Sequence, residues 1–316
     1  MDNNKMASNA SFVSRSKGAM LGLALGDALG TTLEFKSKDS YVPLTDMVGG
    51  GPFRLNAGEW TDDTSMALCL AESLLAVGDH DAQDQIERYL RWREEGENSV
   101  KGYCFDIGNT VSSAINRYLD IGDPNAGIEE SYTAGNGSLM RLAPVAVFFS
   151  TVKGVSKETL FAMAEASSVV THAEQRAIQG CQIMAHLMDK VFHGERDKAV
   201  LFASLEAQFS HVHEDFFPLV SGAFVTKSRD EINGTGFVVD ALEAALWCFA
   251  HSDNFAEGAL LAANLGDDAD TTAAIYGQLA GAFYSLEGLP SDWLAKLAWR
   301  EKIEDYGKQL SQSRTV

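Results

Sequence analysis

Apolar residues recur at three- and four-residue spacing along almost the whole chain, and this pattern limits the fold more than any other feature. The two-residue alternation typical of half-buried strands is nearly absent, and the 316 residues include only 6 prolines. We therefore predict an all-α fold with one compact helical domain. Helices are expected at residues 17–29, 62–77, 81–95, 108–120, 138–149, 157–170, 173–193, 197–209, 214–225, 236–250, 255–264, 270–286 and 291–311.

The first expected helix carries a row of glycines, Gly18, Gly22 and Gly26, along one face. Because glycine has no side chain, a second helix can approach this face closely, and we expect the first helix to be central. Residues 1–16 are polar and lack a hydrophobic core, so they are expected to form a flexible arm rather than a secretory signal. Residues 17–316 then make up the domain.

The chain is strongly acidic, with 25 Lys and Arg against 44 Asp and Glu and a net charge of −19. Such a surface argues against binding to nucleic acids or to anionic membranes. It would also repel a small anionic substrate unless the site carried local positive charge. A bound metal ion could supply that charge.

The four cysteines, Cys69, Cys104, Cys181 and Cys248, are far apart and lie mostly in apolar stretches. Without a CxxC pair they do not predict a zinc site, and we expect buried, reduced thiols. Reduced thiols are typical of a reducing compartment, so the cytoplasm is the expected location. No apolar stretch is long enough for a membrane-spanning helix.

Two short acidic clusters about two hundred residues apart are the main candidates for a functional site. Thr61-Asp62-Asp63-Thr64 and Asp267-Asp268-Ala269-Asp270-Thr271 each open an expected helix. Carboxylates in a first helical turn can simply cap the helix, and this alternative fits either cluster alone. Capping, however, does not call for adjacent carboxylates and hydroxyls at both places. The clusters together therefore predict an all-oxygen site for hard divalent cations such as Mg²⁺ or Mn²⁺.

Three further carboxylates are candidates of different strength. Asp106 lies between Phe105 and Ile107, and an apolar setting raises a carboxyl pKa, which suits a general acid or base. Its alternative role is again a helix cap. Glu34 follows the first helix and alone is a weak signal, since such residues are usually solvated. Asp27 lies in an apolar helix, where we expect it to pair, to cap or to support the site.

The turn Gly135-Asn136-Gly137-Ser138-Leu139-Met140-Arg141 leads into an expected helix. Its backbone N–H groups could hold a phosphate and Arg141 could add charge, although the lysine of a P-loop is missing. The alternative is a simple turn capped by Ser138. His172 follows Thr171 between two helices, and a lone histidine is more often structural than functional.

Together these motifs resemble the ADP-ribosylglycohydrolase family. They occur in the family's order from about residue 17 to about residue 290. One departure is Asp267, where the family often has a glycine, but this removes no ligand. The matching strings are Gly26-Asp27-Ala28-Leu29-Gly30 with Glu34-Phe35, Trp60-Thr61-Asp62-Asp63-Thr64, Phe105-Asp106-Ile107-Gly108-Asn109-Thr110, Gly135-Asn136-Gly137-Ser138-Leu139-Met140-Arg141, Thr171-His172, and Gly266-Asp267-Asp268-Ala269-Asp270-Thr271 with Ala273-Ala274-Ile275.

The resemblance implies an orthogonal all-α bundle with two divalent cations, Mg²⁺ or Mn²⁺, in a central cleft. The implied metal ligands are Thr61, Asp62, Asp63, Asp268, Asp270 and Thr271. The implied catalytic residues are Asp106, Asp62, Asp63 and Glu34, the last at the mouth of the cleft. The implied substrate contacts are Gly102, Tyr103, Asn136, Gly137, Ser138, Arg141 and His172.

The activity that this resemblance implies is hydrolysis of ADP-ribose from a modified protein side chain. Arginine is the expected linkage because the motif around Asp106 resembles the arginine-processing branch. One alternative is a non-catalytic or dual-role protein that binds and blocks an ADP-ribosyltransferase through the polar arm. Another is a Mg²⁺-dependent diphosphate enzyme such as a terpenoid synthase, but the first cluster lacks the third acidic residue expected one turn later.

Overall fold

The computed structural model describes residues 3–150 and 156–312, with side chains from residue 11 on. Within these residues helices make up the fold, and the only β-pairing consists of three isolated bridges, which confirms the all-α prediction. Short 3₁₀ turns connect several of the helices. The α-helices are α1 (Asn3–Gly30), α2 (Asp62–Val77), α3 (Ala82–Glu95), α4 (Asn109–Ile121), α5 (Ala143–Ser150), α6 (Lys157–Val169), α7 (Gln175–Phe192), α8 (Lys198–Gln208), α9 (Phe217–Val220), α10 (Val238–Ala250), α11 (Phe255–Ala263), α12 (Ala269–Tyr284), α13 (Ser291–Lys296) and α14 (Arg300–Gln312).

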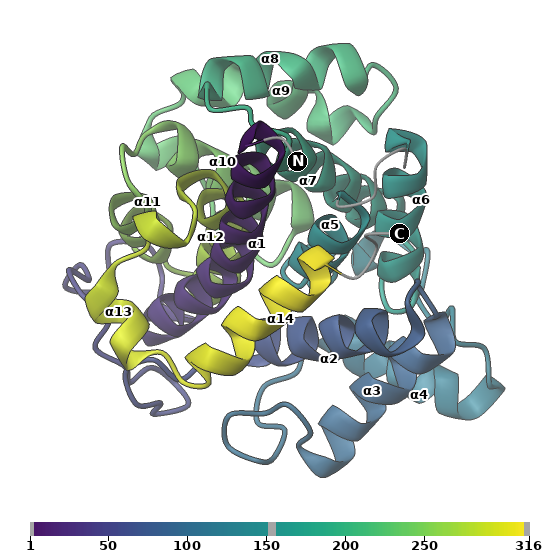
Figure 1. Cartoon of the computed structure of the whole chain (residues 1–316). Coiled ribbons are helices and arrows are strands. Elements are labelled where there is room, and N and C mark those ends of the chain that lie inside the picture. The colour runs from purple at the N-terminus through teal and green to yellow at the C-terminus, as the bar shows by residue number, and fades with distance from the viewer. Residues whose placement is uncertain (1–2, 151–155, 313–316) are drawn as a thin grey trace.

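Helices α1 and α12 lie against each other through the middle of the molecule, with α14 on the other side of α1 (Figure 1). The predicted glycine row forms this contact. A Cβ atom at Gly22 would lie 2.2 Å from the Gly277 carbonyl oxygen, and one at Gly26 would lie 2.0 Å from that of Ala273. Because the contacts run in opposite directions along the two helices, the end of α1 meets the beginning of α12.

Helix α1 begins at Asn3, well before the expected start near residue 17. Phe12 packs against Phe192 with ring centroids 5.3 Å apart, and Ser16 is fully buried. The Arg15 guanidinium donates hydrogen bonds to the carbonyl oxygens of Val191 and Phe192, at 3.2 and 2.9 Å. The expected boundary between a flexible arm and the domain therefore does not fall at residue 16, because residues 11–16 pack on the rest of the helical domain.

Two of the expected helices are interrupted for local reasons. The segment expected as a helix over 214–225 forms short pieces, because Pro218 limits the backbone and Gly222 has a left-handed φ of 78°. The segment expected over 291–311 is split between α13 and α14, where Trp299 has a φ of 54°. The helix expected over 138–149 begins only at Ala143, which leaves residues 138–142 as a turn.

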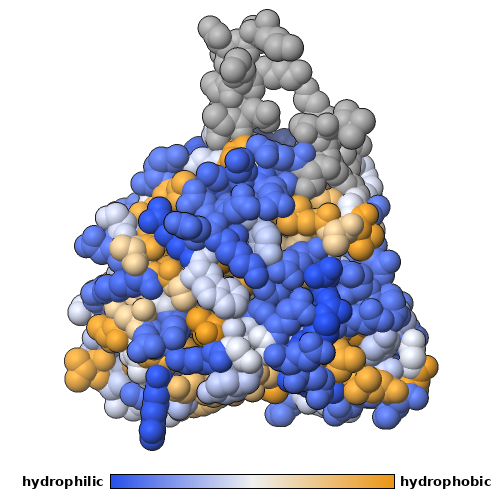
Figure 2. Space-filling model, turned by 60° about the horizontal axis from the view of Figure 1, so that its bottom comes forward, coloured by the Kyte–Doolittle hydropathy of each residue, from blue (hydrophilic) through white to orange (hydrophobic). Residues whose placement is uncertain are grey.

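The four cysteines are free, and three are buried while Cys104 is half-buried, which agrees with the prediction of reduced thiols. None of the helices that the structure describes has the length and apolar character needed to cross a bilayer. On the face shown in Figure 2, hydrophilic residues predominate and hydrophobic ones occur in small groups between them.

Candidate active site

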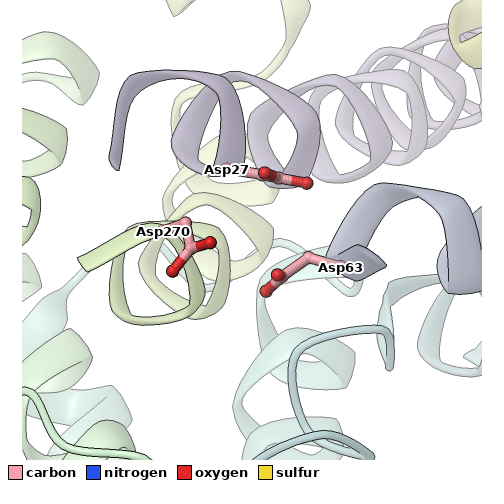
Figure 3. Close-up of side chains that lie close together, drawn as sticks. All are labelled: Asp27, Asp63 and Asp270. Carbon is pink, nitrogen blue, oxygen red and sulfur yellow. The ribbon is translucent and has the colours of Figure 1, made fainter. Parts of the chain in front are cut away.

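Three carboxylates from three helices converge where α1 ends and α2 and α12 begin (Figure 3). Asp27 comes from α1, Asp63 from α2 and Asp270 from α12, and one oxygen atom of each lies within 4.8 Å of those of the other two. All three side chains are buried. The close packing of α1 on α12 is what brings Asp27 beside Asp270, so the glycine row positions this cluster.

Asp27 holds the first acidic cluster in place. Its Oδ1 atom accepts hydrogen bonds from the backbone N–H and the hydroxyl of Thr61, at 2.9 and 2.8 Å. Its Oδ2 atom accepts the corresponding bonds from Thr64, at 3.0 and 2.6 Å. Asp27 thus binds the free N–H groups at the start of α2. Because α2 is capped from another helix, Asp62 and Asp63 are not needed as caps. The structure therefore disfavours the alternative that these two residues only cap α2.

The second cluster has a different support. The Asn136 amide donates a hydrogen bond of 2.7 Å to Asp268 Oδ2. Asp267 has a φ of 54°, a conformation that favours glycine, and this explains why a glycine suits the position. The backbone of Asp267 exchanges two hydrogen bonds with the segment after Glu34: the Phe35 N–H donates to the Asp267 carbonyl, and the Asp267 N–H donates to that of Lys36, both at 2.7 Å.

The two clusters open onto a cleft of about 880 Å³. Thr61 and Asp63 are buried next to the cleft lining. The Thr61 hydroxyl lies 3.2 Å from Asp63 Oδ2 and 3.4 Å from Asp270 Oδ2. The structure therefore brings the six predicted metal ligands to one place. Of the residues predicted to act in the site, those that line the cleft are Glu34, Asp62, Asp106, Asn136, Gly137, His172, Asp268, Asp270 and Thr271.

Burial and mutual repulsion raise the pKa values of the carboxyls along the cleft. Burial, followed by the charges of Asp270 and Asp106, raises the pKa of Glu34 to about 12. Burial and the charge of Asp62 raise the pKa of Asp106 to about 10, and burial and the charge of Asp27 raise the pKa of Asp62 to about 7. Glu34, Asp106 and Asp270 each place one oxygen within 4.8 Å of the others. So many negative charges cannot coexist here without protons or cations.

Two oxygen atoms show that this donor set suits a cation. Asp63 Oδ1 and Glu34 Oε2 are buried and have no hydrogen-bond partner within the described part of the chain. Buried polar atoms are nearly always paired, and a carboxylate oxygen can only accept. Crowded carboxylate and hydroxyl oxygens of this kind fit a hard divalent cation.

His172 forms part of the cleft beside the 135–137 turn. It is 2% exposed, and its Nδ1 atom lies 2.8 Å from the Thr171 hydroxyl oxygen. Its ring is so close to Gly137 that a Cβ atom there would lie 2.8 Å from His172 Cε1. Burial and the nearby charge of Arg141 lower the pKa of His172 to about 3, so the ring is neutral at physiological pH.

Arg141 and Ser138 are not among the described residues that line the cleft, although direct substrate contacts were expected of both. The Arg141 guanidinium is 1% exposed, donates to the Gly137 carbonyl and the Thr171 hydroxyl, both at 2.7 Å, and lies 4.7 Å from the centre of the Tyr89 ring. Arg141 therefore holds the turn from beneath, with these donors directed at protein atoms. Ser138 is buried and accepts a hydrogen bond from the Ser168 hydroxyl at 2.7 Å.

Gly102 and Tyr103 are exposed and also lie outside the described cleft lining, on a loop next to Asp106. Sequence reasoning missed other residues that do line the cleft, among them Tyr132 and Phe237. Tyr132 is 80% exposed, and no motif marks either residue. The sequence feature that could have indicated Tyr132 as a cleft residue is its place in the long loop before the Asn136 turn.

Comparisons with known proteins agree with this geometry. The family model described as ADP-ribosylglycohydrolase matches residues 8–316. The ADP-ribosylarginine hydrolase Tri1 of Serratia proteamaculans is 44% identical over 304 residues, which cover 94% of this chain and 78% of the relative. Tri1 of Pseudomonas putida is 45% identical over 298 residues, covering 94% and 77%.

A more distant relative and a solved structure extend the comparison. The ADP-ribosyl-[dinitrogen reductase] glycohydrolase of Rhodospirillum rubrum is 35% identical over 296 residues, covering 92% of each chain. A solved structure of an ADP-ribosylglycohydrolase-related protein complex superposes with a TM-score of 0.85 at 40% identity, covering 96% of this chain and 99% of the other. The matched length thus spans nearly the whole chain, including the segments that carry both acidic clusters.

Proposed function

This chain belongs to the ADP-ribosylglycohydrolase family, and from this premise we propose that it hydrolyses the bond between ADP-ribose and arginine side chains of modified proteins. The observation that carries the proposal is the convergence of both acidic clusters on one cleft, in a chain 44% and 45% identical to two ADP-ribosylarginine hydrolases. The cleft volume of about 880 Å³ is within the usual range for small-molecule sites.

We assign the cations to the oxygen atoms at the meeting point of the three helices. Two divalent cations, Mg²⁺ or Mn²⁺, would offset the clustered negative charge and polarise a ribose hydroxyl or a water molecule. Asp27 would keep the Thr61 oxygen in position through its hydrogen bond, in the way that outer partners orient metal ligands. The ligands in this assignment are Thr61, Asp62, Asp63, Asp268, Asp270 and Thr271.

We assign the substrate contacts to the side of the 135–137 turn that lines the cleft. Asn136, Gly137 and neutral His172 would contact ADP-ribose, because all three line the cleft beside Asp268. Arg141 and Ser138 would act on binding only through the turn that they support from beneath. The partner is then an ADP-ribosylated protein whose modified side chain enters the cleft.

Hydrolysis must break the bond from C1″ of the ribose to a guanidine nitrogen and form a bond from C1″ to a water oxygen. The departing nitrogen needs a proton, since a guanidine is a poor leaving group without one. Asp106 can hold that proton near neutral pH because burial and Asp62 raise its pKa to about 10. Bound cations would lower the pKa of Glu34, and its carboxylate, which lies in the same group of three, would then be placed to accept the proton of the water.

The test is the release of free ADP-ribose from an ADP-ribosylarginine peptide, with Mg²⁺, with Mn²⁺ and after chelation. Asp270→Asn should lower the rate by at least about 100-fold, because Asp270 belongs to both carboxylate groups. Asp106→Asn should lower it by about 10²–10⁴-fold, the usual contribution of one acid–base group. Asp305→Asn, at an exposed position on α14, is the control and should leave the rate unchanged. Wild-type turnover in the chelated protein would refute the metal-dependent mechanism.

The three remaining expectations have different outcomes. Family membership replaces the terpenoid-synthase alternative. A blocking interaction with an ADP-ribosyltransferase stays a prediction, as does the cytoplasmic location. The arm that motivated the blocking interaction is helical from Asn3.

A further inference from the structure

Four aromatic side chains lie in a row at the mouth of the cleft, and they belong to neither acidic cluster. Ring centroids are 6.4 Å apart for Phe35 and Phe53, 5.2 Å for Phe53 and Phe105, and 6.1 Å for Phe105 and Tyr103. We call this set the aromatic row. Its first member, Phe35, lines the cleft, and its last, Tyr103, does not, so the row leads from the cleft to the outer surface.

The rings at both ends of the row are exposed to solvent, Phe35 by 70% and Tyr103 by 60%. Phe53 and Phe105 between them are half-buried. Three separate loops contribute, at residues 35, 53 and 103–105, and no single loop could form the row alone. Contiguous exposed aromatic surface of this kind is typical of binding sites.

The backbone holds Phe35 in an unfavourable conformation. Its φ of 61° is rare for a bulky residue and persists only where the surroundings enforce it. Here the two backbone hydrogen bonds between residues 35–36 and Asp267 enforce it. The ring is thereby kept at the cleft mouth and out of the core, next to the segment that carries Asp268 and Asp270.

The row borders the carboxylates proposed for proton transfer. Phe35 follows Glu34 directly, and Phe105 precedes Asp106. Aromatic faces attract cations, and the oxygen atoms of nearby carboxyl groups can accept hydrogen bonds from them. A guanidinium group satisfies both partners best, because it is planar, stacks on rings and forms paired hydrogen bonds with carboxylates.

The position in the cleft fits the side chain of the target and not the nucleotide. ADP-ribose would follow the hydrogen-bonding residues Asn136, Gly137 and His172, whereas the aromatic row adjoins Glu34 and Asp106. An arginine attached at C1″ would therefore extend past these two carboxylates onto the row. This step rests on the function proposed above.

We propose that the aromatic row binds the arginine side chain of the modified protein, with the guanidinium stacked on Phe35 and the rest of the side chain and its neighbours along Phe105 and Tyr103. The row is thus a specificity-determining surface for arginine-linked ADP-ribose, distinct from the residues that hold the nucleotide and the cations. It takes part in binding and in no bond-breaking step.

The test compares the dissociation constants of three ligands by calorimetry in the presence of Mg²⁺. They are free ADP-ribose, an arginine peptide that carries ADP-ribose through a non-hydrolysable bond, and the same peptide with a serine linkage. Phe35→Ala should weaken binding of the arginine peptide by about three- to ten-fold, the usual size of a cation–π contact. Binding of free ADP-ribose and of the serine peptide should not change.

Matched variants test whether the weaker binding comes from loss of the aromatic face at position 35. Phe35→Tyr keeps an aromatic face and should bind the arginine peptide as the wild type does, whereas Phe35→Leu should resemble Phe35→Ala. Phe217→Ala removes another exposed phenylalanine, 53% exposed and outside the described cleft lining, and should change none of the three constants. Thermal melting checks that each variant is folded.

Two results would overturn the proposal. If Phe35→Ala weakened all three ligands equally, the row would contact the nucleotide, and if it weakened none, the row would have no part in binding. Because these measurements need no turnover, they are independent of the hydrolysis assay. A wild-type protein that released no ADP-ribose from arginine peptides would refute the proposed function, while the binding constants would still decide the role of the row.

Discussion

The first acidic cluster, at residues 61–64, and the second, at residues 267–271, have similar sequences but different supports. The first is held by a buried carboxylate, Asp27, through four hydrogen bonds from Thr61 and Thr64. The second is held by the Asn136 amide and by the packing of α12 on α1. Helix α1 is common to both, because it supplies Asp27 to one cluster and the glycine surface to the other.

This difference indicates how negative charge is distributed in the site. Supporting the first cluster with Asp27 adds another carboxylate to a buried acidic group, whereas the Asn136 amide adds a neutral donor. Burial raises the pKa of Asp268 and the bond from Asn136 opposes this rise, whereas burial and the charge of Asp27 raise the pKa of Asp62 to about 7. We therefore expect Asp62 to depend more on bound cations than Asp268 does.

The largest expected effect comes from breaking the α1–α12 contact, which both clusters share. In Gly26→Val the Cβ would lie 2.0 Å from the Ala273 carbonyl oxygen, so the helices must move apart. We expect a loss of at least about 3 kcal/mol in the free energy of unfolding, measured with urea, together with loss of metal binding. Gly108→Ala is the control, since it adds a Cβ where nothing lies within 4 Å. An unchanged urea midpoint for Gly26→Val would contradict the central role of this contact.

The sequence predicted these features to different degrees. Helical periodicity located most of the helices, and the glycine row indicated the close contact of the first one, since both signals are local. The sequence could not show that the last expected helix is split at Trp299, because a tryptophan gives no sign of a positive φ. Nor did it show that Arg141 is buried under the turn, because a charged residue beside a glycine loop is usually exposed. The bonds from Thr61 and Thr64 to Asp27 join distant segments and appear only in the fold.

The next largest effect distinguishes the two supports. Asp27→Ala removes the acceptor of two backbone N–H groups and two hydroxyls, and we expect a loss of about 2–3 kcal/mol in the free energy of unfolding. Asn136→Ala removes one donor to Asp268 and should lose about 1 kcal/mol. Urea unfolding at saturating Mg²⁺ measures both, because bound cations remove the charge repulsion that Asp27→Ala would otherwise relieve.

Asp27→Asn gives the matched control for this pair, because it preserves the size of the side chain and one acceptor oxygen. Its loss of stability should fall between those of the other two variants. If Asn136→Ala lowered the free energy of unfolding as much as Asp27→Ala does, the two clusters would have equivalent supports, and the inferred difference between these supports would be wrong.

A different kind of effect is the pH dependence of stability in the metal-free protein. The pKa values of Asp62 and Asp106, raised to about 7 and about 10, lie above the unfolded value near 4. From about pH 4 to 7 the folded chain therefore binds more protons than the unfolded chain, and the free energy of unfolding falls as the pH rises. The slope is up to about 1.4 kcal/mol per pH unit for each such proton. Buried His172, with its pKa lowered to about 3, acts in the opposite direction below about pH 6.5.

Adding Mg²⁺ should displace these protons, so metal binding near pH 6 should release protons that calorimetry in buffers of different ionisation enthalpy can count. The two clusters should differ here as well. Asp62→Asn should reduce both the pH-dependent decline and the proton release more than Asp268→Asn does, because the Asn136 amide already favours the charged form of Asp268. Equal proton release from these two variants would mean that the amide and carboxylate supports leave the clusters with the same affinity for protons. The charge asymmetry inferred from Asp27 and Asn136 would then be wrong, even if the hydrogen bonds are as described.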